Sequence, residues 1–182
     1  AAGADILLVG DSLAMVVLGH DTTLTVTLDE MLHHARAVTR VARRCLVVGD
    51  LPFGSSQLSV EGTVAAAIRY LKEAQVHAVK LEGRWPEHVH ALVRAGVPVV
   101  GHLGLTPQSI HRFGGYRVQG KTLEDASELV NAAIELEQAG CFALVLEGVP
   151  SEVAAVVTRK LGIPTIGIGA GAVCDGQVLV IH

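Results

Sequence analysis

The feature that most constrains the fold is a repeated unit, in which a short apolar segment ends in a polar residue and a helical pattern follows. Segments rich in Val, Leu and Ile occupy residues 6–9, 45–49, 78–82, 98–102, 143–147, 164–168 and 178–181. Continuous apolar runs of this length are typical of parallel strands that are covered on both faces. The alternation of such strands with helices therefore predicts an α/β fold with right-handed crossovers.

Helical periodicity connects most of these strands. We predict helices over residues 28–43, 60–75, 86–95, 123–139 and 151–161. Thr27 and Glu30 have the spacing of a capping box, and Thr122 is a second candidate cap. Gly140 stands where a left-handed residue commonly ends a helix.

Polar residues at the strand ends distinguish two possible arrangements of the strands. They are spread along the whole chain, at Asp11, Asp50, Glu82, His102 and Glu147. An open doubly wound sheet concentrates such residues near one switch point, whereas a (β/α)8 barrel gathers all strand ends into one ring. No GxGxxG motif follows the first strand. The pattern favours a (β/α)8 TIM barrel over an open sheet.

The strand count is one short of a closed barrel. The length of 182 residues suits one domain, residues 1–182. The chain begins "AAGADILLVG", like the end of a helix leading into a strand, and stops at His182 on its last strand. We therefore expect a single partial TIM-barrel catalytic domain that lacks its first strand-helix unit and its final helix.

Composition argues against several classes of protein. Half of the residues are hydrophobic and 18% are charged, which indicates a large core. A net charge of -4 and 3% aromatic residues give no footprint for nucleic acid. No apolar stretch reaches the roughly 18 residues of a membrane helix, and no signal peptide is visible. We expect a cytoplasmic protein in which Cys45 and Cys141, which open apolar strands, are buried thiols.

Three carboxylates at successive strand ends predict a metal site. Asp11, Asp50 and Glu82 would repel one another if they met unneutralised at one barrel mouth. A hard divalent cation removes this repulsion, and a site with few carboxylates that leaves room for water and substrate suits Mg²⁺. The alternative is that each acid caps a helix or pairs with an arginine.

Two further strand residues are candidates for substrate binding. Lys80 stands two residues before Glu82, so both side chains point to the same side of a strand. Lys80 would hold an anionic substrate, or would form a structural ion pair with Glu82. His102 would donate a hydrogen bond to the substrate, or would be a structural histidine.

Glu147 and a glycine-rich loop complete the candidates. Glu147 ends "ALVLE" and precedes Gly148-Val149-Pro150, which suits a partly desolvated general acid or base. The alternative is a cap for the helix that begins near Ser151. The segment "FGGYRVQGK" at 113–121 reads as a loop over the barrel mouth, or as an ordinary surface loop.

The order of several motifs resembles one enzyme family. They are "LVGDSLAMVVLGHD", "DLPFGS", "AVKLEG", "GHLGLTPQSIHRFGGYRVQGK", "LVLEGVP" and "IPTIGIGAGAVCDG", and together they span the chain from residue 3 onward. This order resembles the ketopantoate hydroxymethyltransferases, which are (β/α)8 barrels of the phosphoenolpyruvate mutase and isocitrate lyase superfamily. One departure is Arg84, which follows Gly83 where the family usually has a second glycine; we expect it to stiffen the loop after Glu82.

The resemblance implies a reaction and a set of roles. The family transfers a hydroxymethyl group from 5,10-methylenetetrahydrofolate to 3-methyl-2-oxobutanoate and gives 2-dehydropantoate for pantothenate and coenzyme A synthesis. By motif, Mg²⁺ would be held by Asp11, Asp50 and Glu82. The oxo acid would be contacted by Asp11, Ser12, Asp50, Lys80 and His102. Glu147 would accept the proton, and the chain would assemble as a homodecamer.

Two other functions stay open at this point. One is a truncated or inactive paralogue that binds a 2-oxo acid without catalysis. The other is a superfamily lyase or mutase acting on a different 2-oxo acid, although the "KxCGH" loop usual in those relatives is absent from this sequence.

Overall fold

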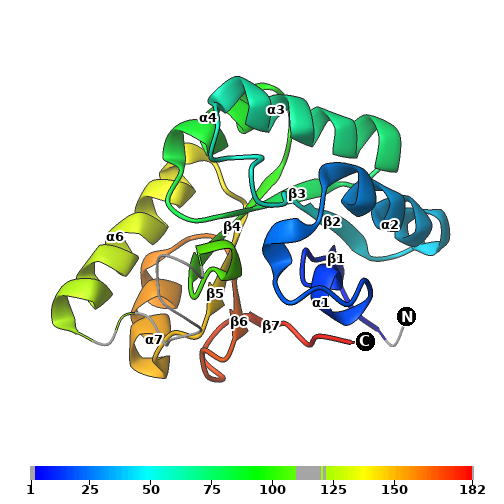
Figure 1. Cartoon of the computed structure of the whole chain (residues 1–182). Coiled ribbons are helices and arrows are strands. Elements are labelled where there is room, and N and C mark those ends of the chain that lie inside the picture. The colour runs from blue at the N-terminus through cyan, green and yellow to red at the C-terminus, as the bar shows by residue number, and fades with distance from the viewer. Residues whose placement is uncertain (1–2, 110–119, 121, 182) are drawn as a thin grey trace. The chain divides into compact units, whose positions relative to one another are not determined.

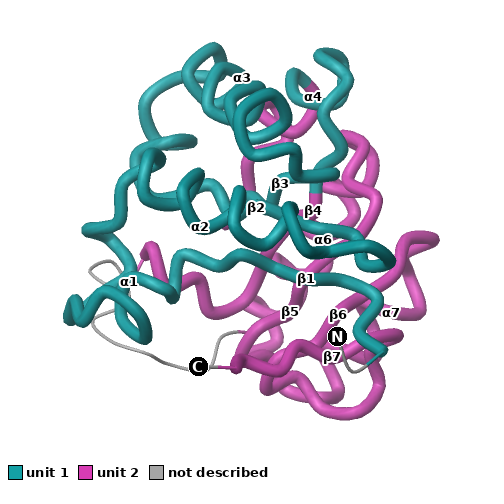
Figure 2. Tube along the Cα trace, turned by 90° about the vertical axis from the view of Figure 1, so that its right-hand side faces the viewer, with its two compact units in different colours: residues 1–81, 91–99, 182 teal, residues 82–90, 100–181 magenta. Residues whose placement is uncertain are grey.

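The computed structural model describes residues 3–109, 120 and 122–181. These residues form two compact units, coloured separately in Figure 2. Unit 1 comprises the chain up to Leu81 together with Ala91–Val99, and unit 2 comprises Glu82–His90 and the chain from Val100 onward. The chain passes between the two units at Leu81–Glu82, at His90–Ala91 and at Val99–Val100.

The strands are parallel and follow one another in chain order. They are β1 (Ile6–Val9), β2 (Leu46–Asp50), β3 (Ala78–Glu82), β4 (Val99–Gly104), β5 (Ala143–Glu147), β6 (Thr165–Ile168) and β7 (Gly176–Gln177). Helices alternate with them along the chain (Figure 1). Sequential parallel order, without the reversal of a doubly wound sheet, is the arrangement of barrel-type α/β folds. The predicted fold class is confirmed.

The predicted helices are all present, with their caps. They are α2 (Leu28–Val41), α3 (Val60–Arg69), α4 (Pro86–Arg94), α6 (Leu123–Ala139) and α7 (Ser151–Lys160), and a short helix α1 (Leu13–Val16) precedes them. Thr27 and Glu30 form the predicted capping box, and Thr122 forms a second one with Asp125. Gly140 ends α6 with φ 110°, a left-handed conformation that favours glycine.

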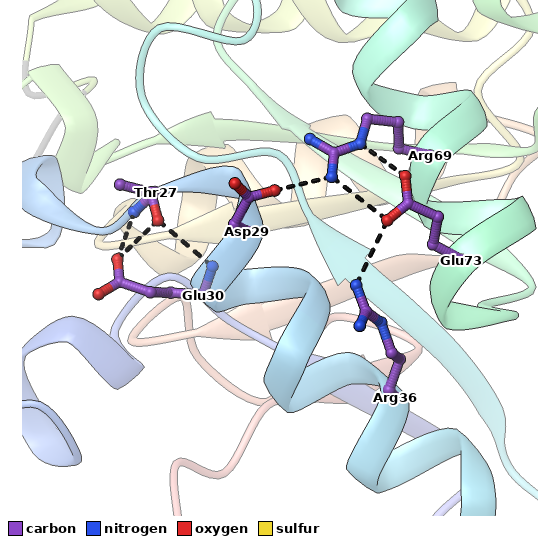
Figure 3. Close-up of polar contacts among 6 residues, drawn as sticks. All are labelled: Thr27, Asp29, Glu30, Arg36, Arg69 and Glu73. Carbon is purple, nitrogen blue, oxygen red and sulfur yellow. Dashed lines mark hydrogen bonds and ion pairs between the residues drawn. The ribbon is translucent and has the colours of Figure 1, made fainter.

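In unit 1, exposed ion pairs connect α2 with the end of α3. The buried face of α2, which includes Met31, Leu32 and Ala35, packs toward β1 and β2. Figure 3 shows the polar contacts above it: Arg69 donates to Asp29 at 2.7 Å and to Glu73 at 2.7 Å, and Arg36 reaches Glu73 at 3.3 Å. Exposed ion pairs are individually weak, but together they connect the end of α3 and the turn after it to α2.

The end of α3 departs from the prediction. The helix expected over 60–75 is α-helical only to Arg69 and continues as one π-helical turn, η2 (Tyr70–Ala74). Gln75 ends the turn with a left-handed backbone at φ 55°. Hydrophobic periodicity does not distinguish a π turn from an α-helical turn, which explains the missed break.

In unit 2, α6 and α7 supply the buried helical side chains. Leu129 and Leu136 of α6 and Val157 of α7 are at most 9% exposed. Glu137 of α6 accepts hydrogen bonds from the backbone N–H groups of Gly162, at 2.6 Å, and Ile163, at 3.1 Å. The loop that leads into β6 is therefore fixed to α6.

The last predicted strand was wrong. We expected it over 178–181, but β7 lies at Gly176–Gln177 and pairs with Ile166 and Gly167 of β6. Val178 adds one hydrogen bond to the Gly167 carbonyl at 2.9 Å. Past this point β6 ends and the chain turns at Gly169, whose φ is 61°. The apolar run that follows is exposed, with Leu179 and Ile181 at 85% each.

The remaining fold predictions concern the cysteines, the hydropathy of the helices and the loop at 113–121. Cys45 and Cys141 are buried free thiols, as expected, and Cys174 is half-buried. Among the described residues, no helix combines the length and hydropathy needed to cross a bilayer. The predicted loop at 113–121 lies outside the described residues apart from Gly120.

Asp175 gives a pH-dependent prediction. The Thr165 backbone N–H, at 2.8 Å, and the Thr165 hydroxyl, at 3.1 Å, donate to its carboxylate, and these hydrogen bonds hold the pKa of Asp175 below its usual value. A lowered carboxyl pKa stabilises the fold above the unfolded-state pKa of about 3.9, and this contribution is lost as the pH falls through the folded-state pKa.

We therefore expect Asp175→Asn to lower the free energy of unfolding by a constant amount between about pH 5 and 8, and by less below about pH 4. Chemical denaturation across this range measures it, with Glu124→Gln on the exposed start of α6 as the control. A difference that does not shrink in acid would contradict the assignment.

Candidate functional site

In unit 1, the ends of β1 and β2 bring two buried aspartates together. Asp50 is the last residue of β2, and Asp11 follows β1. The backbone N–H of Asp11 donates to Asp50 Oδ2 at 3.1 Å. The two residues are 4% and 1% exposed, so this carboxylate is almost completely removed from water. A buried charge of this kind requires hydrogen bonds or an opposite charge.

The opposite charge comes from the neighbouring strand. β2 and β3 pair in a register that places Asp50 beside Lys80. Lys80 Nζ lies 2.9 Å from Asp50 Oδ1, and both side chains are almost fully buried. Lys80 therefore forms a structural ion pair, as one of the two hypotheses expected, and this ion pair joins it to Asp50. A buried lysine in this position can also hold an anionic group.

Ser12 lies at the same end of unit 1. A Cβ atom built on Gly10 would lie 3.3 Å from the Ser12 hydroxyl and 3.8 Å from Asp50 Oδ2. The hydroxyl and the carboxylate thus flank the same backbone position. Ser12 is half-buried and begins α1 without capping it through its side chain. Its hydroxyl is free of a capping role.

Sequence reasoning missed one residue that contacts this group. The Tyr70 hydroxyl donates to the backbone carbonyl of Asp50 at 2.5 Å, and Tyr70 is 0% exposed. Burial, with the charges of Asp50 and Asp11, raises the pKa of Tyr70, so the phenol keeps its proton. A signal for this contact was present in the sequence: Gly49, inside a strand, marks a close approach by another group.

In unit 2, an imidazole lies between two carboxylates. Glu82 ends β3, His102 lies in β4 and Glu147 ends β5. His102 Nδ1 lies 3.2 Å from Glu82 Oε1, and Nε2 lies 3.3 Å from Glu147 Oε2. Since a neutral imidazole has one N–H, it can donate to only one of them, and the protonated ring can donate to both. The Glu147 side chain is 23% exposed and is the most accessible of the three.

Two segments contact Glu82, one after β3 and one after β4. The backbone N–H of Gln108 donates to Glu82 Oε2 at 3.1 Å, a contact that sequence reasoning did not anticipate. Trp85 Nε1 donates to the Glu82 carbonyl at 2.9 Å. Arg84, the departure from the family pattern, makes a two-point ion pair with Glu135 of α6. This pair raises the pKa of Arg84 and lowers that of Glu135, and it connects the loop to α6.

The structure also tests the alternative reading of Glu147. Helix α7 has Pro150 at its N-cap position and no side-chain cap. The expectation that Glu147 caps this helix is therefore wrong. Asp11 and Asp50 of unit 1 are buried carboxylates, and Glu82 of unit 2 is buried as well. Their carboxylate oxygens are hard donors, which fit a hard divalent cation.

Comparison with known proteins is consistent along the whole chain. The family model described as ketopantoate hydroxymethyltransferase matches residues 1–182. A 3-methyl-2-oxobutanoate hydroxymethyltransferase from Syntrophobacter fumaroxidans is 62% identical over 100% of this chain, and one from Cyanothece is 60% identical over 98%. The chain spans 65% and 70% of these two relatives. A mitochondrial form from Oryza sativa is 57% identical, and the chain spans 46% of it.

Solved structures support the same fold. A phosphoenolpyruvate phosphomutase from Streptomyces platensis superposes with a TM-score of 0.70 at 13% identity, over 97% of this chain and 68% of that one. A 2,3-dimethylmalate lyase, described as a member of the PEP mutase/isocitrate lyase superfamily, gives 0.63 at 19% identity, over 91% of this chain and 58% of that one. With the family match over its full length, the chain belongs to the ketopantoate hydroxymethyltransferase family.

Proposed function

We propose that this chain catalyses the transfer of a hydroxymethyl group from 5,10-methylenetetrahydrofolate to 3-methyl-2-oxobutanoate, giving 2-dehydropantoate for pantothenate synthesis. The observation that carries the proposal is the set of ionisable side chains at the ends of β1 to β5, of which all but Glu147 are buried, on a chain that belongs to this family. Candidate metal ligands, a candidate cation for the substrate and a candidate base all occur at these strand ends.

Asp11, Asp50 and Glu82 are the proposed ligands of Mg²⁺. When bound, the ion would act as a Lewis acid on the keto oxygen of the substrate and make the neighbouring C–H bond more acidic. The buried carboxylates supply the hard oxygen ligands that such an ion prefers. Lys80, Ser12 and His102 are the proposed contacts of the oxo acid, together with Asp11 and Asp50.

Glu147 is the proposed base. Its carboxylate would take the proton from C3 of 3-methyl-2-oxobutanoate, and the resulting enolate carbon would form the new C–C bond to the one-carbon unit of the folate. Water supplies the oxygen of the hydroxymethyl group, and tetrahydrofolate leaves. The His102 ring, whose Nε2 lies 3.3 Å from Glu147 Oε2, supports this role, because an imidazole beside a carboxylate can orient it. A base must reach its substrate, and the Glu147 side chain, which is 23% exposed, is accessible.

The other two candidate functions have less support. A paralogue without activity would not be expected to retain Asp50 and Glu147, and the "KxCGH" loop usual in the superfamily lyases and mutases is absent from this sequence. Assembly as a homodecamer is carried over from the family resemblance and cytoplasmic location from the composition, and both stay proposals.

Asp50→Asn tests the metal assignment. Mutation of an outer-shell partner of a metal site typically weakens metal affinity by about 10–100-fold. Because Asp50→Asn removes the charge of a proposed direct ligand, we expect a larger loss of Mg²⁺-dependent binding of 3-methyl-2-oxobutanoate. Isothermal titration calorimetry with and without Mg²⁺ measures this. Asp21→Asn, an exposed carboxylate in the same unit, is the control. Unchanged affinity in a cooperatively folded Asp50→Asn protein would mean that Asp50 is not a ligand.

Glu147→Gln tests the base. The amide keeps the shape of the side chain but cannot accept the C3 proton, so we expect exchange of this proton with D₂O to fall by about 10²–10⁴-fold while binding stays within about threefold. Proton NMR of 3-methyl-2-oxobutanoate follows the exchange in the presence of Mg²⁺ and without folate. The matched control is Glu152→Gln, an exposed residue of α7. Exchange at the native rate in Glu147→Gln would remove this residue as the base.

A further inference from the structure

We propose that Tyr70 is a positioning residue for Asp50, delivered to the end of β2 by the π turn that follows α3. The contacts that carry the inference all lie within unit 1. Its consequence for catalysis rests on the function proposed above, but the contact itself can be tested without that function.

Tyr70 contacts the backbone of β2 in two ways. Its hydroxyl donates to the Asp50 carbonyl at 2.5 Å. Its ring lies against Gly49, since a Cβ atom built on that glycine would lie 2.5 Å from two ring carbons. Any other residue at position 49 would therefore displace the ring. The last two residues of β2 are held by one side chain, whose hydroxyl directs the peptide that leads out of Asp50.

The position of Tyr70 depends on the local helix geometry. A π turn holds one residue more than an α-helical turn, and such turns are frequent at functional sites. Here the turn is held from outside by Arg69 and Arg36, which both contact Glu73 (Figure 3). The Thr39 hydroxyl of α2 also donates to the Ala74 carbonyl at 2.8 Å. The outer contacts thus secure the turn, and Tyr70 projects from its inner side.

The backbone contact has a direct effect on the carboxylate. Asp50 receives a hydrogen bond from the Asp11 N–H at 3.1 Å and an ion pair from Lys80 at 2.9 Å. One partner follows β1 and the other lies in β3, so the carboxylate meets both only while the Asp50 backbone stays in place. Without the Tyr70 hydroxyl, the buried Asp50 carbonyl loses this hydrogen bond, and the end of β2 is held less firmly.

The test is hydrogen exchange of the Asp11 amide, because this amide donates to the Asp50 carboxylate. We expect Tyr70→Phe, which removes only the hydroxyl, to raise the exchange rate of this amide by about tenfold at neutral pH, as loss of a buried hydrogen-bond partner predicts. NMR of the complete metal-free chain measures it. The Leu46 amide, at the other end of β2, serves as the internal reference for global opening.

Thr39→Val is the matched control, since it also removes a hydroxyl that donates to a backbone carbonyl in unit 1 but touches the outer side of the π turn. We expect the ratio of Asp11 to Leu46 exchange to stay unchanged in it. Gly49→Ala, which displaces the ring and leaves the hydroxyl, should raise the ratio as Tyr70→Phe does. Equal ratios in all three variants and the native protein would overturn the proposal.

A second measurement separates this inference from the proposed function. Calorimetry of 3-methyl-2-oxobutanoate with Mg²⁺ should give an affinity about tenfold weaker for Tyr70→Phe than for Thr39→Val. If native protein binds no metal and oxo acid while the exchange ratio rises in Tyr70→Phe, the proposed function fails and the positioning role stands. If native protein binds both and Tyr70→Phe changes neither affinity nor exchange, only the positioning role fails.

Discussion

The arrangement of unit 1 depends on the buried ion pair between Lys80 and Asp50. Removing two charges from water costs several kcal/mol per ion unless good geometry and further hydrogen bonds compensate. The Asp50 carboxylate obtains that compensation from Lys80 of β3 and from the N–H of Asp11 after β1, and the Tyr70 hydroxyl donates to the backbone carbonyl of Asp50. Each partner comes from a different element, so the strand register and the end of α3 must be correct together.

In unit 2, the group beside the carboxylates is a histidine and not a lysine. His102 replaces the fixed charge of a lysine with a ring that contacts Glu82 on one side and Glu147 on the other. The Lys80 ammonium group donates from a single nitrogen, whereas an imidazole has one nitrogen on each of two sides of its ring. The Lys80–Asp50 ion pair thus includes a proposed metal ligand, and the His102 ring lies beside Glu147, the proposed base.

The sequence predicted those parts of the structure that periodicity and strand ends determine. The strand ends carrying Asp11, Asp50, Glu82 and Glu147 were found because parallel strands read as continuous apolar runs. Helix 123–139 was predicted to the residue, since Thr122 and Gly140 are strong signals for its two ends. The strand-end pattern predicted a metal site and a general acid or base, and the family resemblance added the substrate and the reaction.

The rest could not be read from one sequence, because it depends on contacts between distant segments. The π turn at Tyr70 is determined by its packing against Gly49 and by partners on α2. The end of β7 depends on where β6 turns away, at Gly169, and not on the apolar residues that follow it. The Gln108 contact to Glu82 arises from a short 3-10 helix (Pro107–Ser109), which is too brief to show a hydrophobic periodicity.

The cysteines have a practical consequence. Unit 1 contains the buried thiol of Cys45, and unit 2 contains that of Cys141. Burial raises the pKa of Cys141 to about 12, so its thiolate is scarce in the native protein. Alkylating reagents reach such a thiol when the surrounding structure opens. Since each unit carries one, mass spectrometry of labelled peptides would record the opening rate of the two units separately, without any engineered probe.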